Sequence, residues 1–210
     1  MNSNVKKNIA VFASGAGSNF INIHNKIKKN EINARISLLV SNNAKSGAVM
    51  FCIDNDINFL IYNDKRFPDD IDNKELIDKM HFHKIDLILL AGYMKKISRN
   101  FIDLFNKKIM NVHPSLLPLY GGRGFYGMNV HNAVFKNKEK ETGATIHFVD
   151  YNYDTGPILI QKKINIEKND DPVRIADKVL KIEHQIYPKA VSFFCDNKIS
   201  WNNNKPIIEE

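Results

Sequence analysis

Short apolar runs alternate with segments of helical periodicity over the first 113 residues. The runs, such as residues 9–13 and 86–91, have the length of strands, and the second is the continuous apolar run expected of a parallel strand covered on both faces. Between them, Phe20, Ile23 and Ile27 recur at helical spacing. This alternation predicts an α/β fold built on a mostly parallel sheet.

The same patterns place the other elements. Further strands are predicted at 35–40 and 58–61, with a fifth that ends at Asn111 and His113, and further helices at 45–55, 68–83, 98–105 and 129–135. After Pro118, strands at 142–149 and 158–166 follow each other without a helix, which predicts an antiparallel addition to the sheet.

The C-terminal part of the chain is predicted to be mainly one helix. It begins after Asp170 or Asp171, and Pro188 is expected to kink it or split it in two. From residue 197 on, the pattern indicates a short strand around Trp201 and then a polar tail.

The composition is that of a soluble globular protein, with 43% hydrophobic and 25% charged residues and no apolar run of membrane-spanning length. Length, and the lack of a repeat or linker, predict a single domain over residues 1–210 with polar tails at 1–8 and 202–210. The start lacks the apolar region of a signal peptide. Because Cys52 and Cys195 are also far apart, we expect a cytoplasmic protein.

The net charge of +7 comes from 30 Lys and Arg against 23 Asp and Glu. The lysines are scattered, with no basic stripe interleaved with aromatic residues, which disfavours nucleic acid and favours small anionic substrates. The seven histidines show no metal-ligand spacing, so no metal is expected.

A glycine-rich turn at residues 14–19, Ser-Gly-Ala-Gly-Ser-Asn, joins the first strand to the first helix. Its glycines allow close backbone approach, and the helix start offers unpaired N–H groups to an anion. Phe20 replaces the last glycine of a dinucleotide motif and there is no Walker lysine, so a single phosphate group is the better ligand. The alternative is a plain turn capped by Ser18 or Asn19.

Asn111 and His113 are two residues apart at the end of a predicted strand, before Pro114. They project from the same side, at the edge of a sheet where α/β proteins bind ligands. One offers a fixed hydrogen-bond donor and the other a group that changes protonation near neutral pH, as acyl transfer requires. On residue types alone, a pair that only ties down a Pro-rich loop is equally expected.

Three segments together resemble the phosphoribosylglycinamide formyltransferase family, the folate-dependent formyltransferases of purine biosynthesis. They are Ser-Gly-Ala-Gly-Ser-Asn at 14–19, Asn-Val-His-Pro-Ser-Leu-Leu-Pro at 111–118, and Asp-Thr-Gly-Pro at 154–157, in the family's order over nearly the whole chain. The resemblance implies a Rossmann-like formyltransferase fold, and transfer of a formyl group from 10-formyltetrahydrofolate to the amine of 5-phosphoribosylglycinamide without a metal.

The resemblance also implies roles for residues. Asn111 would hold the formyl oxygen and His113 would act as the acid, with a pKa raised by Asp154. The other implied sets are Gly17, Ser18 and Asn19 for the substrate phosphate; His147 and Glu183 beside the substrate amine; and Met94, Lys95, Lys96, Ile97, Asn111, Val149 and Asp150 for folate.

The chain departs from the family pattern in the segments expected to bind anions. Lys95-Lys96 replaces an Arg-apolar pair, and Asp69 stands where an arginine often holds the folate glutamate, so Arg66 or Lys95 would have to substitute. Leu180 occupies a phosphate-binding position, where Lys181 is the neighbouring cation.

Other functions remain open from the sequence. Formyltransferases for methionyl-tRNA or amino sugars usually carry an extra C-terminal domain, and formyl-folate hydrolases an extra N-terminal one, for which this chain has no room. A nucleotide-binding module without catalysis would not need Asn111, His113 and Asp154 together. A monomer or a homodimer is expected.

Overall fold

The computed structural model describes residues 5–70 and 72–209. The chain forms two compact units, which divide between Met110 and Asn111. The single-domain organisation stays a prediction.

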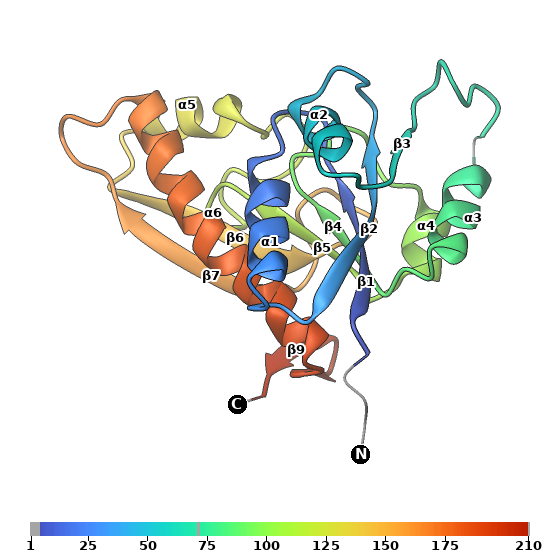
Figure 1. Cartoon of the computed structure of the whole chain (residues 1–210). Coiled ribbons are helices and arrows are strands. Elements are labelled where there is room, and N and C mark those ends of the chain that lie inside the picture. The colour runs from blue at the N-terminus through green and yellow to red at the C-terminus, as the bar shows by residue number, and fades with distance from the viewer. Residues whose placement is uncertain (1–4, 71, 210) are drawn as a thin grey trace. The chain divides into compact units, whose positions relative to one another are not determined.

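The first unit contains a parallel sheet with strand order β3-β2-β1-β4. Its elements are β1 (Lys7–Phe12), α1 (Ser18–Lys28), β2 (Ala34–Ser41), α2 (Gly47–Asp54), β3 (Phe59–Ile61), α3 (Lys74–Phe82), β4 (Leu87–Leu90) and α4 (Arg99–Leu104) (Figure 1). β1 and β4 pair side by side, from Ile9 opposite Leu87 to Phe12 opposite Leu90. Ile9–Phe12 and Leu87–Leu89 are fully buried, so the central strands are covered on both faces, as predicted.

The second unit begins within β5 (Ile109–His113). Its other elements are α5 (Met128–Lys136), β6 (Glu141–Phe148), β7 (Ile158–Asn165), α6 (Pro172–Cys195), β8 (Ile199–Asn202) and β9 (Lys205–Ile208). β6 pairs with β7 in antiparallel register, which confirms the predicted addition to the sheet. α6 packs on β6 and β7 and contacts α5 (Figure 1).

The third helix begins later than predicted. It was expected to start at Pro68, but α3 begins at Lys74. The preceding turn is stabilised by Asp70, whose carboxylate accepts hydrogen bonds from the Tyr62 hydroxyl and from the Glu75 N–H. Ile71, expected on the apolar side of this helix, lies outside the described residues.

Two predictions for the C-terminal part need correction. Pro188 does not split α6, because buried side chains on both sides of the proline, among them Tyr187 and Ala190, hold one continuous helix in the core; the alternative of a kink stays a prediction. The expected polar tail contains strand β9, which pairs with β8 in a hairpin. The cap prediction was right for Asp171, whose carboxylate accepts from the Arg174 N–H.

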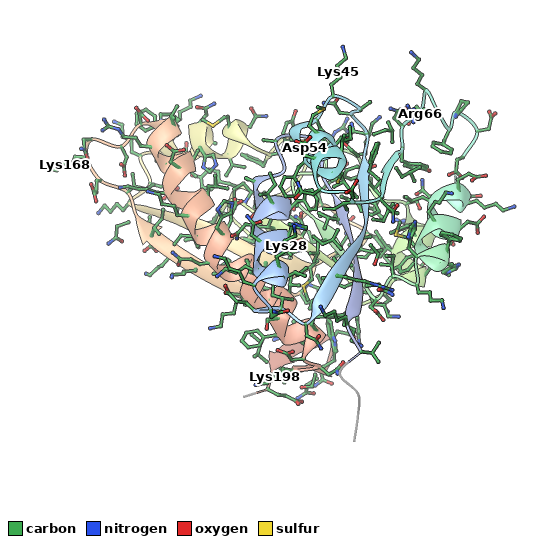
Figure 2. The ribbon with its side chains drawn as sticks, viewed as in Figure 1. Lys28, Lys45, Asp54, Arg66, Lys168 and Lys198 are labelled. Atoms are coloured by element: carbon green, nitrogen blue, oxygen red, sulfur yellow. The ribbon has the colours of Figure 1, made fainter. Side chains whose placement is uncertain are left out.

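Charged side chains project outward from loops between the elements, as Figure 2 shows for Lys45, Arg66 and Lys168. Cys52 and Cys195 are both buried and unbridged. Within the described residues, no helix is both long enough and apolar enough to span a membrane.

Candidate active site

Asn111 and His113 lie on β5, which ends just before Pro114. His113 is 3% exposed, so its ring is almost entirely shielded from solvent. Its Nε2 lies 2.7 Å from the backbone oxygen of Tyr120, and its Nδ1 lies 3.5 Å from Oδ1 of Asp154. The predicted pair is therefore part of a larger polar cluster.

His147 is brought into the cluster by β6 and is also buried. Its Nδ1 lies 2.9 Å from the backbone oxygen of Phe148, which can only accept, so Nδ1 carries a hydrogen. In the neutral ring, Nε2 then accepts from Nδ2 of Asn111, at 3.1 Å. The same amino group lies 3.4 Å from Oδ1 of Asp154. Asn111 thus joins a histidine and a carboxylate through its two hydrogens.

Asp154 is in the left-handed region, with φ of 58°. Its Oδ2 accepts from the Gly122 N–H at 2.9 Å, and its Oδ1 faces His113 and His147 at 3.5 and 3.6 Å. The side chain of Asp154 is 11% exposed, so this negative charge is largely removed from water. The four residues Asn111, His113, His147 and Asp154 form the candidate active site.

The predicted effect of Asp154 on His113 is present, but it is not the largest effect on this ring. Burial lowers the pKa of His113 below its usual value, although Asp154 and the Tyr120 carbonyl act to raise it. The net direction is opposite to the predicted increase, because loss of hydration outweighs the attraction of a carboxylate 3.5 Å away. For Asp154, burial raises the pKa, but His147, His113 and the Gly122 N–H together bring it below its usual range.

The predicted phosphate site lies in the first unit, where β1 leads into α1. Gly17 is the N-cap residue with φ of 78°, and a Cβ there would meet the Ala48 Cβ at 2.8 Å, so both conformation and space require glycine. No side chain caps α1, so Ser18 and Asn19 are not the caps of a plain turn. Asn19 is buried in the first turn.

The segment predicted to bind folate, Met94–Lys95–Lys96–Ile97, follows β4 and lies beside this turn. The Ser14 N–H donates to the Gly92 oxygen, and the Met94 N–H donates to the Ser14 hydroxyl at 2.9 Å. Met94 is exposed and Ile97 is buried, while Lys95 forms an exposed ion pair with Asp64. The two loops are adjacent because β1 and β4 are neighbouring parallel strands.

The remaining predicted residues lie in the second unit. The Asp150 carboxylate accepts from the Asn152 N–H and the Thr155 hydroxyl, in the turn between Val149 and Gly156. Glu183 is buried on α6, one turn before Tyr187. Burial and the charge of Glu183 raise the pKa of Tyr187.

Two backbone groups of the site had no signal in the sequence. The carbonyl of Tyr120 and the N–H of Gly122 bind His113 and Asp154, respectively. Backbone groups are present at almost every position, so only the folded loop could identify them.

Comparisons with known proteins show which family the chain is similar to. Residues 7–191 match the model of the formyl transferase family. The chain belongs to this family. A chloroplastic phosphoribosylglycinamide formyltransferase from Arabidopsis thaliana is 40% identical over 207 residues, covering 97% of this chain and 71% of the relative. Its counterpart from Vigna unguiculata is 39% identical over 206 residues, covering 97% of this chain and 66% of the relative.

A solved structure has the same formyltransferase fold. Glycinamide ribonucleotide transformylase 1 from Symbiobacterium toebii superposes with a TM-score of 0.91 and 25% identity, covering 99% of this chain and 96% of that one. The predicted fold class is thereby confirmed. Among the described residues, no group of three or more His, Cys, Asp or Glu side chains could hold a metal ion.

Proposed function

We infer that this chain is a phosphoribosylglycinamide formyltransferase, which transfers the formyl group of 10-formyltetrahydrofolate to the amine of 5-phosphoribosylglycinamide. The products are formylglycinamide ribonucleotide and tetrahydrofolate, as in purine biosynthesis. The observation that carries this inference is that Asp154 joins Asn111 and His113 through polar contacts of 3.4 and 3.5 Å in a member of the formyl transferase family.

In the reaction, the substrate amine attacks the formyl carbon, a carbon–nitrogen bond forms, and the formyl oxygen gains negative charge. Asn111 would donate to this oxygen by redirecting one of the hydrogens that it shares with His147 and Asp154. His113 in its protonated form would stabilise the oxyanion and deliver a proton toward the departing folate nitrogen. The attacking amine loses a proton, which returns to His113 as the bond to the folate nitrogen breaks, so the ring ends the cycle protonated as it began.

Asp154 would act on His113 through charge. Its carboxylate lies 3.5 Å from the ring and favours the protonated imidazole, against the effect of burial. If Asp154 stays ionised when the substrates bind, its negative charge would therefore keep His113 protonated and able to act as the acid. His147 would hold Asn111 in place, and Glu183 would orient the substrate amine.

The phosphate would bind at Gly17, Ser18 and Asn19. Support comes from the left-handed Gly17 and from an α1 N-terminus without a side-chain cap, which leaves backbone N–H groups for an anion. Folate would bind along Met94, Lys95, Lys96 and Ile97, with Asn111, Val149 and Asp150. Lys95 would have to leave Asp64 to reach a glutamate tail, which costs little because the pair is exposed.

The experiment that tests the function is an absorbance assay with 10-formyltetrahydrofolate, run with and without 5-phosphoribosylglycinamide. Formyl loss that requires the ribonucleotide is the expected result. Formyl loss without an acceptor would identify a hydrolase instead, and tight ribonucleotide binding without turnover would identify a non-catalytic module. We propose that the protein is a cytoplasmic monomer or homodimer that binds small molecules and no nucleic acid.

A further inference from the structure

The two nitrogens of His113 have different surroundings. Nε2 lies 2.7 Å from the Tyr120 carbonyl oxygen, and Nδ1 lies 3.5 Å from Oδ1 of Asp154. A carbonyl can only accept, so Nε2 carries a hydrogen whether the ring is neutral or charged. The proton that the ring gains and loses is therefore the one on Nδ1, on the side of Asp154.

The Tyr120 carbonyl belongs to a residue in a strained conformation. Tyr120 has φ of 55°, in the left-handed region that aromatic residues rarely adopt. The preceding peptide is held, since the Ser115 hydroxyl donates to the Leu119 oxygen at 2.6 Å. That bond does not reach the Tyr120 carbonyl, so another contact has to keep this residue in place.

The side chain of Tyr120 supplies such a contact. Its hydroxyl donates to Oε1 of Glu139 at 2.6 Å and accepts from Nδ2 of Asn137 at 2.8 Å. Asn137 is the C-cap residue of α5, and the Glu139 N–H donates to the Val134 oxygen, so both partners are fixed to the end of a helix. A hydroxyl bound to a carboxylate makes one of the stronger hydrogen bonds in proteins.

We propose that Tyr120 is a positioning residue for formyl transfer. Its hydroxyl, anchored by Glu139 and Asn137, keeps the Tyr120 carbonyl on Nε2 of His113 and directs the exchangeable proton to Nδ1. This proposal rests on the proposed function, in which His113 supplies that proton. The charged and titratable groups that act on the ring are Asp154, His147 and His131.

The test is Tyr120→Phe, which removes only the hydroxyl. Nitrogen-15 NMR of the histidine rings measures the tautomer. In Tyr120→Phe, the His113 signal should change from that of a pure Nε2–H tautomer to that of a mixture. The His113 signal is assigned as the one that is missing in a His113→Gln sample. kcat should fall about tenfold, as expected for one lost hydrogen bond, while KM for both substrates stays the same. The high-pH limb of the kcat profile should move to lower pH, since the bond to the Tyr120 carbonyl raises the pKa of His113.

Matched variants separate positioning from general damage. Tyr126→Phe removes a hydroxyl from an exposed tyrosine in the same loop and should match the wild type in every readout. Glu139→Ala should reproduce Tyr120→Phe, whereas Glu139→Gln retains an oxygen acceptor and should restore most of the rate.

An unchanged His113 tautomer in Tyr120→Phe overturns the proposal even if the rate falls, because the loss would then be structural. An equal effect of Tyr126→Phe overturns it as well. The NMR comparison does not depend on turnover. If the wild type transfers no formyl group, the proposed function fails, and the spectra still decide whether Tyr120 positions His113.

Discussion

Asp154 combines an unfavourable backbone conformation with an unfavourable charge. Its left-handed φ costs about 1–3 kcal/mol for a residue other than glycine, and its carboxylate is largely buried. Both costs are offset by the Gly122 N–H and the Asn111 amino group, which donate to the carboxylate. A residue held in this way against two costs is expected to have a function that an ordinary turn residue does not have.

Replacing the acid tests the centre of the mechanism. His113→Ala should lower kcat by about 10² or more, because the departing nitrogen and the oxyanion lose their proton donor. Steady-state kinetics at saturating folate give the measurement, and circular dichroism checks that the fold survives. Turnover at the wild-type rate would remove His113 from the mechanism.

Replacing the carboxylate tests its electrostatic role. Asp154→Asn keeps the shape but removes the charge that raises the pKa of His113, so the imidazolium form becomes scarcer at neutral pH. The rate should fall, and the high-pH limb of the kcat profile should move to lower pH. A profile that coincides with that of the wild type would contradict the pairing.

The phosphate site is tested by binding rather than by turnover. Asn19→Ala should weaken binding of 5-phosphoribosylglycinamide more than binding of folate, since Asn19 lies in the first turn of α1 beside Gly17. Isothermal titration with each substrate alone gives the comparison. Equal losses for both would argue against a phosphate at this turn.

Sequence reasoning found only part of this site. The two-residue spacing of Asn111 and His113 was enough to place them on one side of β5. His147 and Asp154 came only from the family resemblance, because a histidine in a strand and an aspartate in a turn have ordinary structural uses. Asp154 acts to raise the pKa of His113, as the resemblance implied, but the larger opposite effect of burial could not be measured from spacing.

At the scale of elements, β6 and the turn after it depend on two glycines. A Cβ on Gly143 would lie 2.1 Å from the Lys162 oxygen, and one on Gly156 would lie 1.8 Å from the Phe148 oxygen. Both obstacles are backbone atoms that cannot rotate away. The Phe148 oxygen also binds His147, so the packing of this turn and the geometry of the site are linked.

Gly156→Ala should therefore destabilise the protein by about 2 kcal/mol or more, since a methyl group would be forced against a backbone oxygen. Urea unfolding measures the change. Gly15→Ala is the matched control, because a Cβ there meets nothing within 4 Å. Equal stabilities for the two variants would show that the turn relaxes at little cost.

The elements were predicted best where apolar periodicity was strong. β1, β4 and α6 are defined by buried side chains, and sequence alone placed them within a few residues. The start of α3 and the strand β9 were mispredicted, because polar residues there form local hydrogen bonds and a two-stranded hairpin that no hydrophobic pattern marks.

For the whole molecule, stability should decrease in mild acid. Burial, followed by the charge of His113, lowers the pKa of His131 to about 4, and Nδ1 of His131 finds no hydrogen-bond partner in the described part of the chain. In the unfolded chain, His131 becomes protonated near pH 6.5, whereas in the folded protein it stays neutral down to about pH 4. The stability that the neutral ring provides is therefore complete above pH 6.5 and is lost as the pH falls toward 4.

This contribution amounts to about 3 kcal/mol between pH 6.5 and 4, at 1.36 kcal/mol for each pKa unit. Unfolding free energies measured across this range should fall less steeply in His131→Leu than in the wild type. His81→Leu, at an exposed histidine, is measured alongside as the matched substitution. An identical slope in His131→Leu would assign the acid sensitivity to other groups.

The chain that leaves β5 at His113 returns to the ring of the same residue seven positions later, at Tyr120. The side chain of His113 therefore carries the reacting proton and also closes a loop. When its bond to Tyr120 opens, the loop gains conformational entropy. Amide deuterium uptake across residues 114–122 would then report whether the bond between His113 and the Tyr120 carbonyl is closed or open. Any inhibitor that draws His113 away from Tyr120 should loosen this segment, so its binding could be detected by exchange without following the reaction.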